Sequence, residues 1–255
     1  MSDRFLDGKL AFISGGSRNL GETIALELAE RGADIIVNDL GSALDKAGIA
    51  ELISRIEAKG VRAFFMEGDV GDSTSVEAMS TTVTQDIGVV QIVVNCAGPF
   101  NASPFLSLAE KDWDLIMDVN LKAIYLTSKY FCPGMKAIGW GRVISMSAGS
   151  SSVRNHGAYG LAKAGVKFLT EELALELGPS ITVNAVAPGQ IEESLPYIHR
   201  IDPTFGARYT AKAPLGKLVR RIDVARIVSM LCSPLADMIT GETIRIDGGA
   251  ELPRF

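Results

Sequence analysis

Residues 10–21, LAFISGGSRNLG, place a short apolar strand, a glycine-rich turn and the start of a helix in direct succession. Glycine in such a turn lets the backbone approach a phosphate closely, and the N-terminus of the following helix supplies free N–H donors and a favourable dipole. The stretch therefore predicts a pyrophosphate site after the first strand. A tight turn that binds no ligand is the alternative.

The same alternation of strand and helix continues along the chain, which is typical of parallel strands joined by helical crossovers. We predict strands at Leu10–Ser14, Asp34–Asn38, Val61–Met66, Gln91–Asn95, Arg142–Met146, Ile181–Val186 and Thr243–Ile246. Helices are expected at Leu20–Arg31, Asp45–Lys59, Thr74–Ile87, Glu110–Ile138, Tyr159–Gly178 and Ile222–Cys232. Thr74 and Glu77 are expected to form a capping box at the third helix.

These patterns predict a single doubly wound α/β domain of the Rossmann type over residues 1–255, with helices on both faces of a seven-stranded parallel sheet. Residues 189–214 form the least regular part of the chain and are too long for an ordinary connection. We expect them to form a lid over a substrate.

The composition describes an ordinary globular protein and narrows the classes of partner. The 255 residues are 47% hydrophobic and 22% charged, with a formal net charge of -5. No Lys/Arg-rich run suggests nucleic acid or an anionic membrane surface. The sequence has neither a signal-peptide pattern nor an apolar run of ~18 residues, which predicts a cytoplasmic protein. Cys96, Cys132 and Cys232 form no Cys-x-x-Cys motif, so neither disulfides nor a metal are predicted.

Tyr159 and Lys163 stand four residues apart in a helical pattern, and residues at this spacing share one helix face. An unperturbed tyrosine ionises near pH ~10 and needs help to shuttle protons at neutral pH. The charge of Lys163 is expected to lower the pKa of Tyr159 toward the working range. Two half-solvated surface residues are the alternative.

Asp39 directly follows the second predicted strand, 18 residues after Gly21. An acidic side chain at this place accepts hydrogen bonds from an adenosine ribose and repels a 2′-phosphate. A helix N-cap or a solvated turn is the alternative.

Further short motifs follow in order: Asp69-Val70, Asn95-Cys96-Ala97-Gly98, Asn120, Pro188-Gly189 and Asp247-Gly248-Gly249. With the glycine-rich turn and the Tyr159/Lys163 pair, they closely resemble the short-chain dehydrogenase/reductase family, and its oxoacyl-reductase-like members in particular, from about Asp7 to Gly249. The resemblance implies an enzyme that transfers hydride between NAD or NADP and a carbonyl or secondary alcohol. It implies cofactor contacts at Gly15, Ser17, Arg18, Asn19, Leu20, Asp39, Leu40, Asp69, Val70, Asn95, Ala97, Gly98, Tyr159, Lys163, Pro188, Gly189 and Ile191.

The resemblance also implies the catalytic roles. Tyr159 exchanges a proton with the substrate oxygen, and Lys163 holds the nicotinamide ribose and lowers the pKa of Tyr159. Asn120 sits at an irregularity of a long helix and supports a water relay to Lys163. A buried structural asparagine is the alternative for Asn120.

A serine after the fifth strand polarises the substrate carbonyl in this family, and here the sequence departs from the pattern. Ala148 stands where the catalytic serine is usual, and Ser147 lies 12 residues before Tyr159 instead of the typical 13. Ser147 is the best candidate, and Ser145 and Ser150 are the alternatives.

Two other positions depart from the family. Asn19 replaces a glycine of the turn, although asparagine tolerates a positive φ better than most residues. Glu193 replaces a threonine that normally bonds the cofactor carboxamide, and it is expected to be a solvated loop residue rather than a substrate contact. Arg18 is at a place where NADP-users often carry a basic residue, but Asp39 opposes a 2′-phosphate directly, so NAD is favoured.

The family analogy extends to the substrate and the assembly. Reduction of a 3-oxoacyl thioester is placed first on family frequency alone, and a cyclic ketone or a sugar fits the mixed side chains of the lid equally. The resemblance implies a homotetramer that pairs the helices Glu110–Ile138 and Tyr159–Gly178 and the strand Thr243–Ile246. The segment Val166–Leu177 fits such an assembly, since it is apolar on more faces than one sheet covers. A dinucleotide-binding regulatory or structural subunit is the alternative function.

Overall fold

The computed structural model of the protein describes residues 3–42, 45–149, 156–200 and 202–252. Within these ranges, seven strands form one parallel sheet in the order β3-β2-β1-β4-β5-β6-β7. Their bounds are β1 Leu10–Ser14, β2 Asp34–Asp39, β3 Ala63–Glu67, β4 Ile92–Asn95, β5 Gly141–Met146, β6 Ile181–Pro188 and β7 Thr243–Ile246. The predicted doubly wound fold is confirmed, and no strand end differs from its predicted place by more than two residues.

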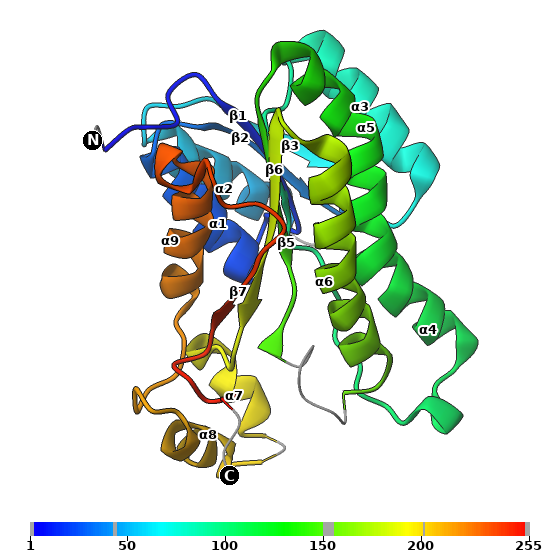
Figure 1. Cartoon of the computed structure of the whole chain (residues 1–255), viewed down its shortest axis with the longest axis vertical. Coiled ribbons are helices and arrows are strands. Elements are labelled where there is room, and N and C mark those ends of the chain that lie inside the picture. Colours follow the sequence, from blue (N-terminus) through cyan, green and yellow to red (C-terminus); the bar gives the residue numbers. More distant parts are fainter. Residues whose placement is uncertain (1–2, 43–44, 150–155, 201, 253–255) are drawn as a thin grey trace.

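Helices cover both faces of this sheet (Figure 1). On one side α1 packs against α2 and α9, and on the other α5 packs against α3 and α6. The bounds are α1 Asn19–Glu30, α2 Lys46–Glu57, α3 Ser73–Asp86, α4 Glu110–Met117, α5 Ala123–Ile138, α6 Gly157–Leu177, α7 Leu195–Ile198, α8 Phe205–Lys212 and α9 Arg221–Cys232.

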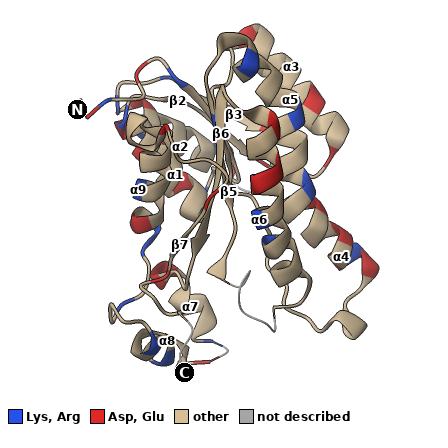
Figure 2. Cartoon of the chain, in the orientation of Figure 1, with Lys and Arg blue, Asp and Glu red and all other residues tan. Residues whose placement is uncertain are grey.

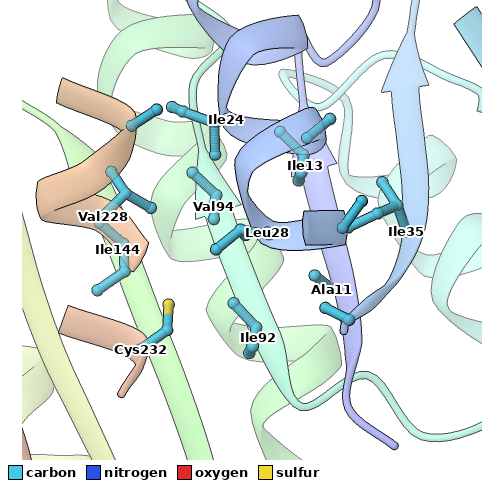
Figure 3. Close-up of a cluster of buried hydrophobic side chains, with 14 of the residues drawn as sticks. Ala11, Ile13, Ile24, Leu28, Ile35, Ile92, Val94, Ile144, Val228 and Cys232 are labelled. Carbon is cyan, nitrogen blue, oxygen red and sulfur yellow. The ribbon is translucent and has the colours of Figure 1, made fainter. Parts of the chain in front are cut away.

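Apolar side chains fill the space between the sheet and each helical layer. Figure 3 shows Ile13 of β1 and Val94 of β4 beside Leu28 of α1, in a cluster of buried residues that extends to α9. The neighbouring residue Phe12 points to the opposite face, because successive side chains of a strand alternate. Its ring lies 4.7 Å from that of Phe131 of α5, between centroids. The central strands are therefore buried on both sides, as their continuous apolar runs predict.

Charged residues are concentrated in the helices and the loops, and few of them lie in the sheet (Figure 2). Arg142 of β5 is an exception, since it is only 4% exposed. Its guanidinium pairs with Asp237 and stacks on the ring of Trp140, 4.5 Å from the centroid. Among the described residues, no helix has both the length and the apolar character to cross a membrane.

The long helix predicted at Glu110–Ile138 is present as α4 and α5, and the irregularity expected at Asn120 is a π-helical turn, η2 (Asp118–Lys122), that joins them. Two other local expectations are corrected by the structure. The predicted capping box is wrong, because Asp72 caps α3 by accepting the N–H groups of Thr74 and Ser75. Residues 189–214 are more regular than expected, with a 3-10 turn, η4 (Glu192–Ser194), followed by α7 and α8.

Candidate functional site

The predicted site residues lie around the carboxyl ends of the neighbouring strands β1 and β4. The strand order reverses between these two strands, and open α/β sheets bind ligands at such a point. Ser14, the last residue of β1, accepts the backbone N–H groups of Cys96 and Ala97 on its hydroxyl oxygen, at 3.1 and 3.2 Å. A Cβ on Gly15 would lie 2.8 Å from the Cα of Ala97. The glycine-rich turn and the segment after β4 are thus held in direct contact.

The turn itself has the backbone that a diphosphate site requires. Gly15 has φ +63°, and a Cβ on Gly21 would meet the carbonyl oxygen of Gly15 at 2.1 Å, so both places need glycine. Asn19, which begins α1, also has a positive φ, of 54°. The N-cap residue Arg18 makes no side-chain capping bond, which leaves the first N–H groups of α1 open to an anion. The geometry fits the phosphates of a dinucleotide.

Asp39 lies beside this turn and is fixed there by two hydrogen bonds. The hydroxyl of Ser17 donates to Oδ2 at 2.5 Å, and the N–H of Leu40 donates to Oδ1 at 2.9 Å. The alternative role of Asp39 as a helix cap is excluded, because Asp45 caps α2. The carboxylate is therefore anchored next to the predicted diphosphate site.

The third strand brings Asp69 and Val70 to the same edge of the sheet. Val70 is buried, and the exposed Asp69 accepts the N–H of Gly71 at 2.8 Å. A cavity of about 330 Å³ opens beside them, lined by Asp69, Gly71, Asp72, Ser73, Leu115, Asp118, Val119 and Lys122.

Asn95 connects three elements behind the cofactor region. Its Oδ1 accepts the hydroxyl of Thr127 in α5 at 2.8 Å, and its Nδ2 donates to the hydroxyl of Ser145 in β5 at 3.2 Å. Ser145 is fully buried, and its hydroxyl oxygen is engaged by the amide of Asn95.

The predicted catalytic residues gather around Gly98. Asn120 is fully buried in the π-helical turn η2, which confirms the expected helix irregularity. Its Nδ2 donates to the carbonyls of Pro99 and Ile116 at 3.0 Å, whereas its buried Oδ1 has no hydrogen-bond partner among the described residues. A Cβ on Gly98 would lie 2.4 Å from that oxygen and 3.5 Å from Nζ of Lys163. The amine and the unpaired amide oxygen thus both lie close to Gly98.

Lys163 is held at this place by two reciprocal bonds to the end of β5. Its Nζ donates to the carbonyl of Met146 at 2.7 Å, and its own carbonyl accepts the hydroxyl of Ser147 at 2.9 Å. The amine lies 5.6 Å from the ring centroid of Tyr159, one turn earlier on α6. Phe100 packs edge-on against the same ring, with centroids 4.9 Å apart.

The direction of the pKa shift at Tyr159 is opposite to the one predicted from the sequence. Burial raises the pKa of Tyr159 to about 12, and burial also lowers the pKa of Lys163 to about 8. Loss of solvent disfavours the charged form of each group, and here this effect exceeds the attraction between ammonium and phenolate.

The serine expected to polarise the substrate is engaged elsewhere. Ser147 is 3% exposed and its only hydroxyl proton points to the carbonyl of Lys163. Within the described residues, no hydrogen bond joins it to Tyr159. The third candidate, Ser150, lies outside the described residues.

The segment after β6 closes the other side of the site. Ile191 pairs with Val219 in a parallel bridge. Tyr209 of α8 accepts the N–H of Gln190 on its hydroxyl at 3.1 Å, and a Cβ on Gly189 would lie 2.3 Å from that oxygen. A second cavity, of about 680 Å³, is lined by Glu192, Leu195, His199, Pro203, Gly206, Ala207, Thr210, Gly216, Lys217, Leu218 and Arg220. None of the predicted catalytic residues lines it.

The fold brings two further residues to the site, Tyr209 and Arg221, that no motif in the sequence marks. Nothing in a helical pattern marks Tyr209 as the partner of a backbone amide. The side chain of Arg221 donates to that of Asn19, 202 positions away in the chain. Within the described residues, no group of three His, Cys, Asp or Glu side chains is placed to hold a metal ion.

Comparison with known proteins agrees with this geometry. A family profile described as enoyl-(acyl carrier protein) reductase matches residues 15–251. The 3-oxoacyl-(acyl-carrier-protein) reductase FabG of Staphylococcus aureus is 35% identical over 244 residues, which cover 94% of this chain and 97% of that protein. A short-chain dehydrogenase/reductase of Armillaria gallica is 33% identical over 253 residues, or 95% of each chain.

Among solved structures, a gluconate 5-dehydrogenase from Burkholderia cenocepacia superimposes with a TM-score of 0.90. It is 28% identical, the match covers 99% of both chains, and its crystal structure is a complex with NADP and tartrate.

The buried amine at position 163 predicts a pH-dependent stability. Between its native pKa of about 8 and the unfolded value of about 10.4, the unfolded chain binds more protons than the native one. The free energy of unfolding therefore rises with pH in this window. The free energy of unfolding is measured with urea for the wild type and for Lys163→Met. From pH 8 to pH 10, the value for the wild type should rise relative to that of the variant by on the order of 2 kcal/mol. A difference between the two proteins that stays constant with pH would contradict this.

Proposed function

This chain belongs to the short-chain dehydrogenase/reductase family, and from that premise we propose that Tyr159, Lys163 and Asn120 carry its proton transfer, with a 3-oxoacyl thioester as the substrate. Its activity is that of an NAD(P)-dependent oxidoreductase that acts on a carbonyl or a secondary alcohol. The observation that carries the proposal is the grouping around Gly98 of a buried amine, an unpaired amide oxygen and a phenol.

The residues that would hold the cofactor follow from the same geometry. The open N–H groups of α1 suit the diphosphate, and the anchored Asp39 suits the adenosine ribose. Lys163 would hold the nicotinamide ribose, with Gly189 and Ile191 beside the ring. When bound, the nicotinamide supplies or accepts the hydride.

Tyr159 is the proton donor of the reaction in the direction of reduction. With a pKa of about 12, its hydroxyl keeps its proton at neutral pH, and a general acid must be protonated before it acts. The proton that it gives to the substrate oxygen is replaced through the amine of Lys163 and a water on Oδ1 of Asn120. In oxidation of an alcohol the phenolate must form first, which burial opposes.

The substrate class is supported by the curated relatives. The 3-oxoacyl reductase of Staphylococcus aureus matches this chain over nearly its whole length. The solved gluconate 5-dehydrogenase makes sugar acids the second candidate. None of the relatives named above is described as a regulatory or structural subunit.

The assembly and the lid are parts of the same proposal. A homotetramer is supported by Phe168 and Leu175, which are 65% and 82% exposed on the outer side of α6. We propose that residues 1–255 form one domain whose lid lies near residues 189–214. In its support, all seven strands belong to one sheet, and α7 and α8 lie together beyond the end of β7 in Figure 1.

The proposed reaction is tested by turnover of a short 3-oxoacyl thioester, a cyclic ketone and a sugar acid with each cofactor. We expect the thioester to be reduced fastest and Tyr159→Phe to lower kcat by roughly a thousandfold, since general acid catalysis is worth about that much. Tyr125→Phe, on the exposed face of α5, is the matched control and should retain full activity. Undiminished turnover by Tyr159→Phe would remove Tyr159 from the mechanism, and a preference for the sugar acid would reassign the substrate.

The variant Ser147→Ala distinguishes two roles for this serine, which are polarisation of the substrate carbonyl and support of Lys163. Because the single hydroxyl proton of Ser147 is used on the Lys163 carbonyl, we propose that this serine supports Lys163 and expect kcat to fall less than tenfold. The lost bond should lower the free energy of unfolding by about 1 kcal/mol. A donor to a developing oxyanion would cost roughly a hundredfold or more in kcat. A loss of that size would show that Ser147 turns toward the substrate.

Preference for NAD(H) over NADP(H) is proposed from the position of Asp39. A carboxylate fixed beside the ribose repels a 2′-phosphate, and Asp39→Ser removes this charge while it keeps a hydrogen-bonding group. The ratio of kcat/KM for NADH to that for NADPH should fall at least tenfold in the variant. Asp45→Ser, at the start of α2, is the control and should leave the ratio unchanged. A wild type that prefers NADPH would refute the assignment.

A further inference from the structure

The two unusual positions noted in the sequence, Asn19 and Glu193, meet at one residue, Arg221. Nη2 of Arg221 donates to Oδ1 of Asn19 at 2.9 Å. The backbone N–H of Arg221 donates to both carboxylate oxygens of Glu193, at 3.1 and 3.2 Å. One arginine therefore joins the glycine-rich turn to the segment that follows β6.

Asn19 needs such a partner because of its backbone. With φ at 54°, it occupies the left-handed region that disfavours side chains with a Cβ, even though asparagine bears it better than most residues. It is also the first residue of α1, whose open N–H groups form the proposed diphosphate site. A bond that fixes the side chain of Asn19 thus fixes the backbone on which those donors depend.

Glu193 serves the other end of the bridge. Arg221 is the first residue of α9, so the carboxylate satisfies one of the free N–H groups of that helix and lies at the positive end of its dipole. The adjacent Arg220 turns its guanidinium to Asp223 instead. The packing of α9 against α1 brings Arg221 near the turn. Glu193 holds the backbone of Arg221 in place, and from there the side chain of Arg221 reaches Asn19.

We propose that Arg221 is a positioning residue for dinucleotide binding, which acts through Asn19 and is itself placed by Glu193. The arginine stabilises the left-handed residue of the turn, so that the N–H groups of α1 are preorganised for a diphosphate. It also ties the substrate-side segment to the same turn. This inference rests on the dinucleotide site proposed above.

Titration of the protein with NADH and NADPH, followed by fluorescence, tests the proposal through the dissociation constant. We expect Arg221→Ala to weaken binding of the preferred cofactor about fivefold, in line with the cost of a left-handed residue that loses its support. Asn19→Gly should bind within twofold of the wild type, since glycine adopts this φ freely. In the Asn19→Gly background, Arg221→Ala should have no further effect.

The matched control is Arg220→Ala, which removes the same charge one residue away but leaves Asn19 untouched, and it should bind within twofold of the wild type. Glu193→Ala alone should weaken cofactor binding. Added to Arg221→Ala, it should cause no further loss. The melting temperature of each variant, measured without cofactor, distinguishes a loss of cofactor binding from a general loss of stability.

The proposal is overturned if Arg221→Ala weakens binding equally with Asn19 and with Gly at position 19, because the guanidinium would then act on the phosphates directly. It is overturned as well if Arg221→Ala changes the melting temperature and not the dissociation constant. A wild type that binds neither dinucleotide would instead refute the cofactor site on which the inference rests.

Discussion

Two reciprocal hydrogen bonds between the end of β5 and α6 hold the site together. Nζ of Lys163 reaches the carbonyl of Met146, and the hydroxyl of Ser147 returns to the carbonyl of Lys163. These bonds fix one turn of α6 against the sheet, and Tyr159 lies one turn away on the same helix. The bonds of Lys163 thus set the position of the phenol relative to the strands. Because the amine of Lys163 is buried, it needs an acceptor such as the carbonyl of Met146.

Burial shifts the pKa of both groups on this face of α6. It raises the pKa of Tyr159 to about 12, so the phenol keeps its proton at neutral pH, and it lowers the pKa of Lys163 to about 8, at which the amine is still largely protonated at neutral pH. Asn120 completes the arrangement, because the π-helical turn η2 turns its amide inward, where Oδ1 lacks a partner among the described residues. An unpaired buried oxygen is costly in a packed core, and a water bound between it and Lys163, as the proposed proton relay requires, would relieve that cost.

The sequence predicts well those features that depend on local pattern. The positions of the seven strands, the glycine-rich turn and the irregular helix at Asn120 follow from apolar runs, from glycine spacing and from family resemblance. The direction of the pKa shift at Tyr159 could not be read in this way, since a spacing of four residues reveals the neighbouring charge but not the depth of burial. Ser147 shows the same limit, because the hydroxyl that a motif assigns to a substrate donates to a backbone carbonyl that only the folded chain brings near.

The departures from the family pattern show why single positions are difficult to judge in isolation. Asn19 in a glycine position suggests a strained turn, and Glu193 in place of a threonine suggests a lost contact to the cofactor. In the fold both side chains bond to Arg221. Its guanidinium holds the side chain of Asn19, and its backbone N–H donates to the carboxylate of Glu193. A glycine-rich turn can therefore carry an asparagine at a positive φ where an element distant in sequence holds its side chain. Here that element is α9, which packs along α1 and brings its first residue to the turn.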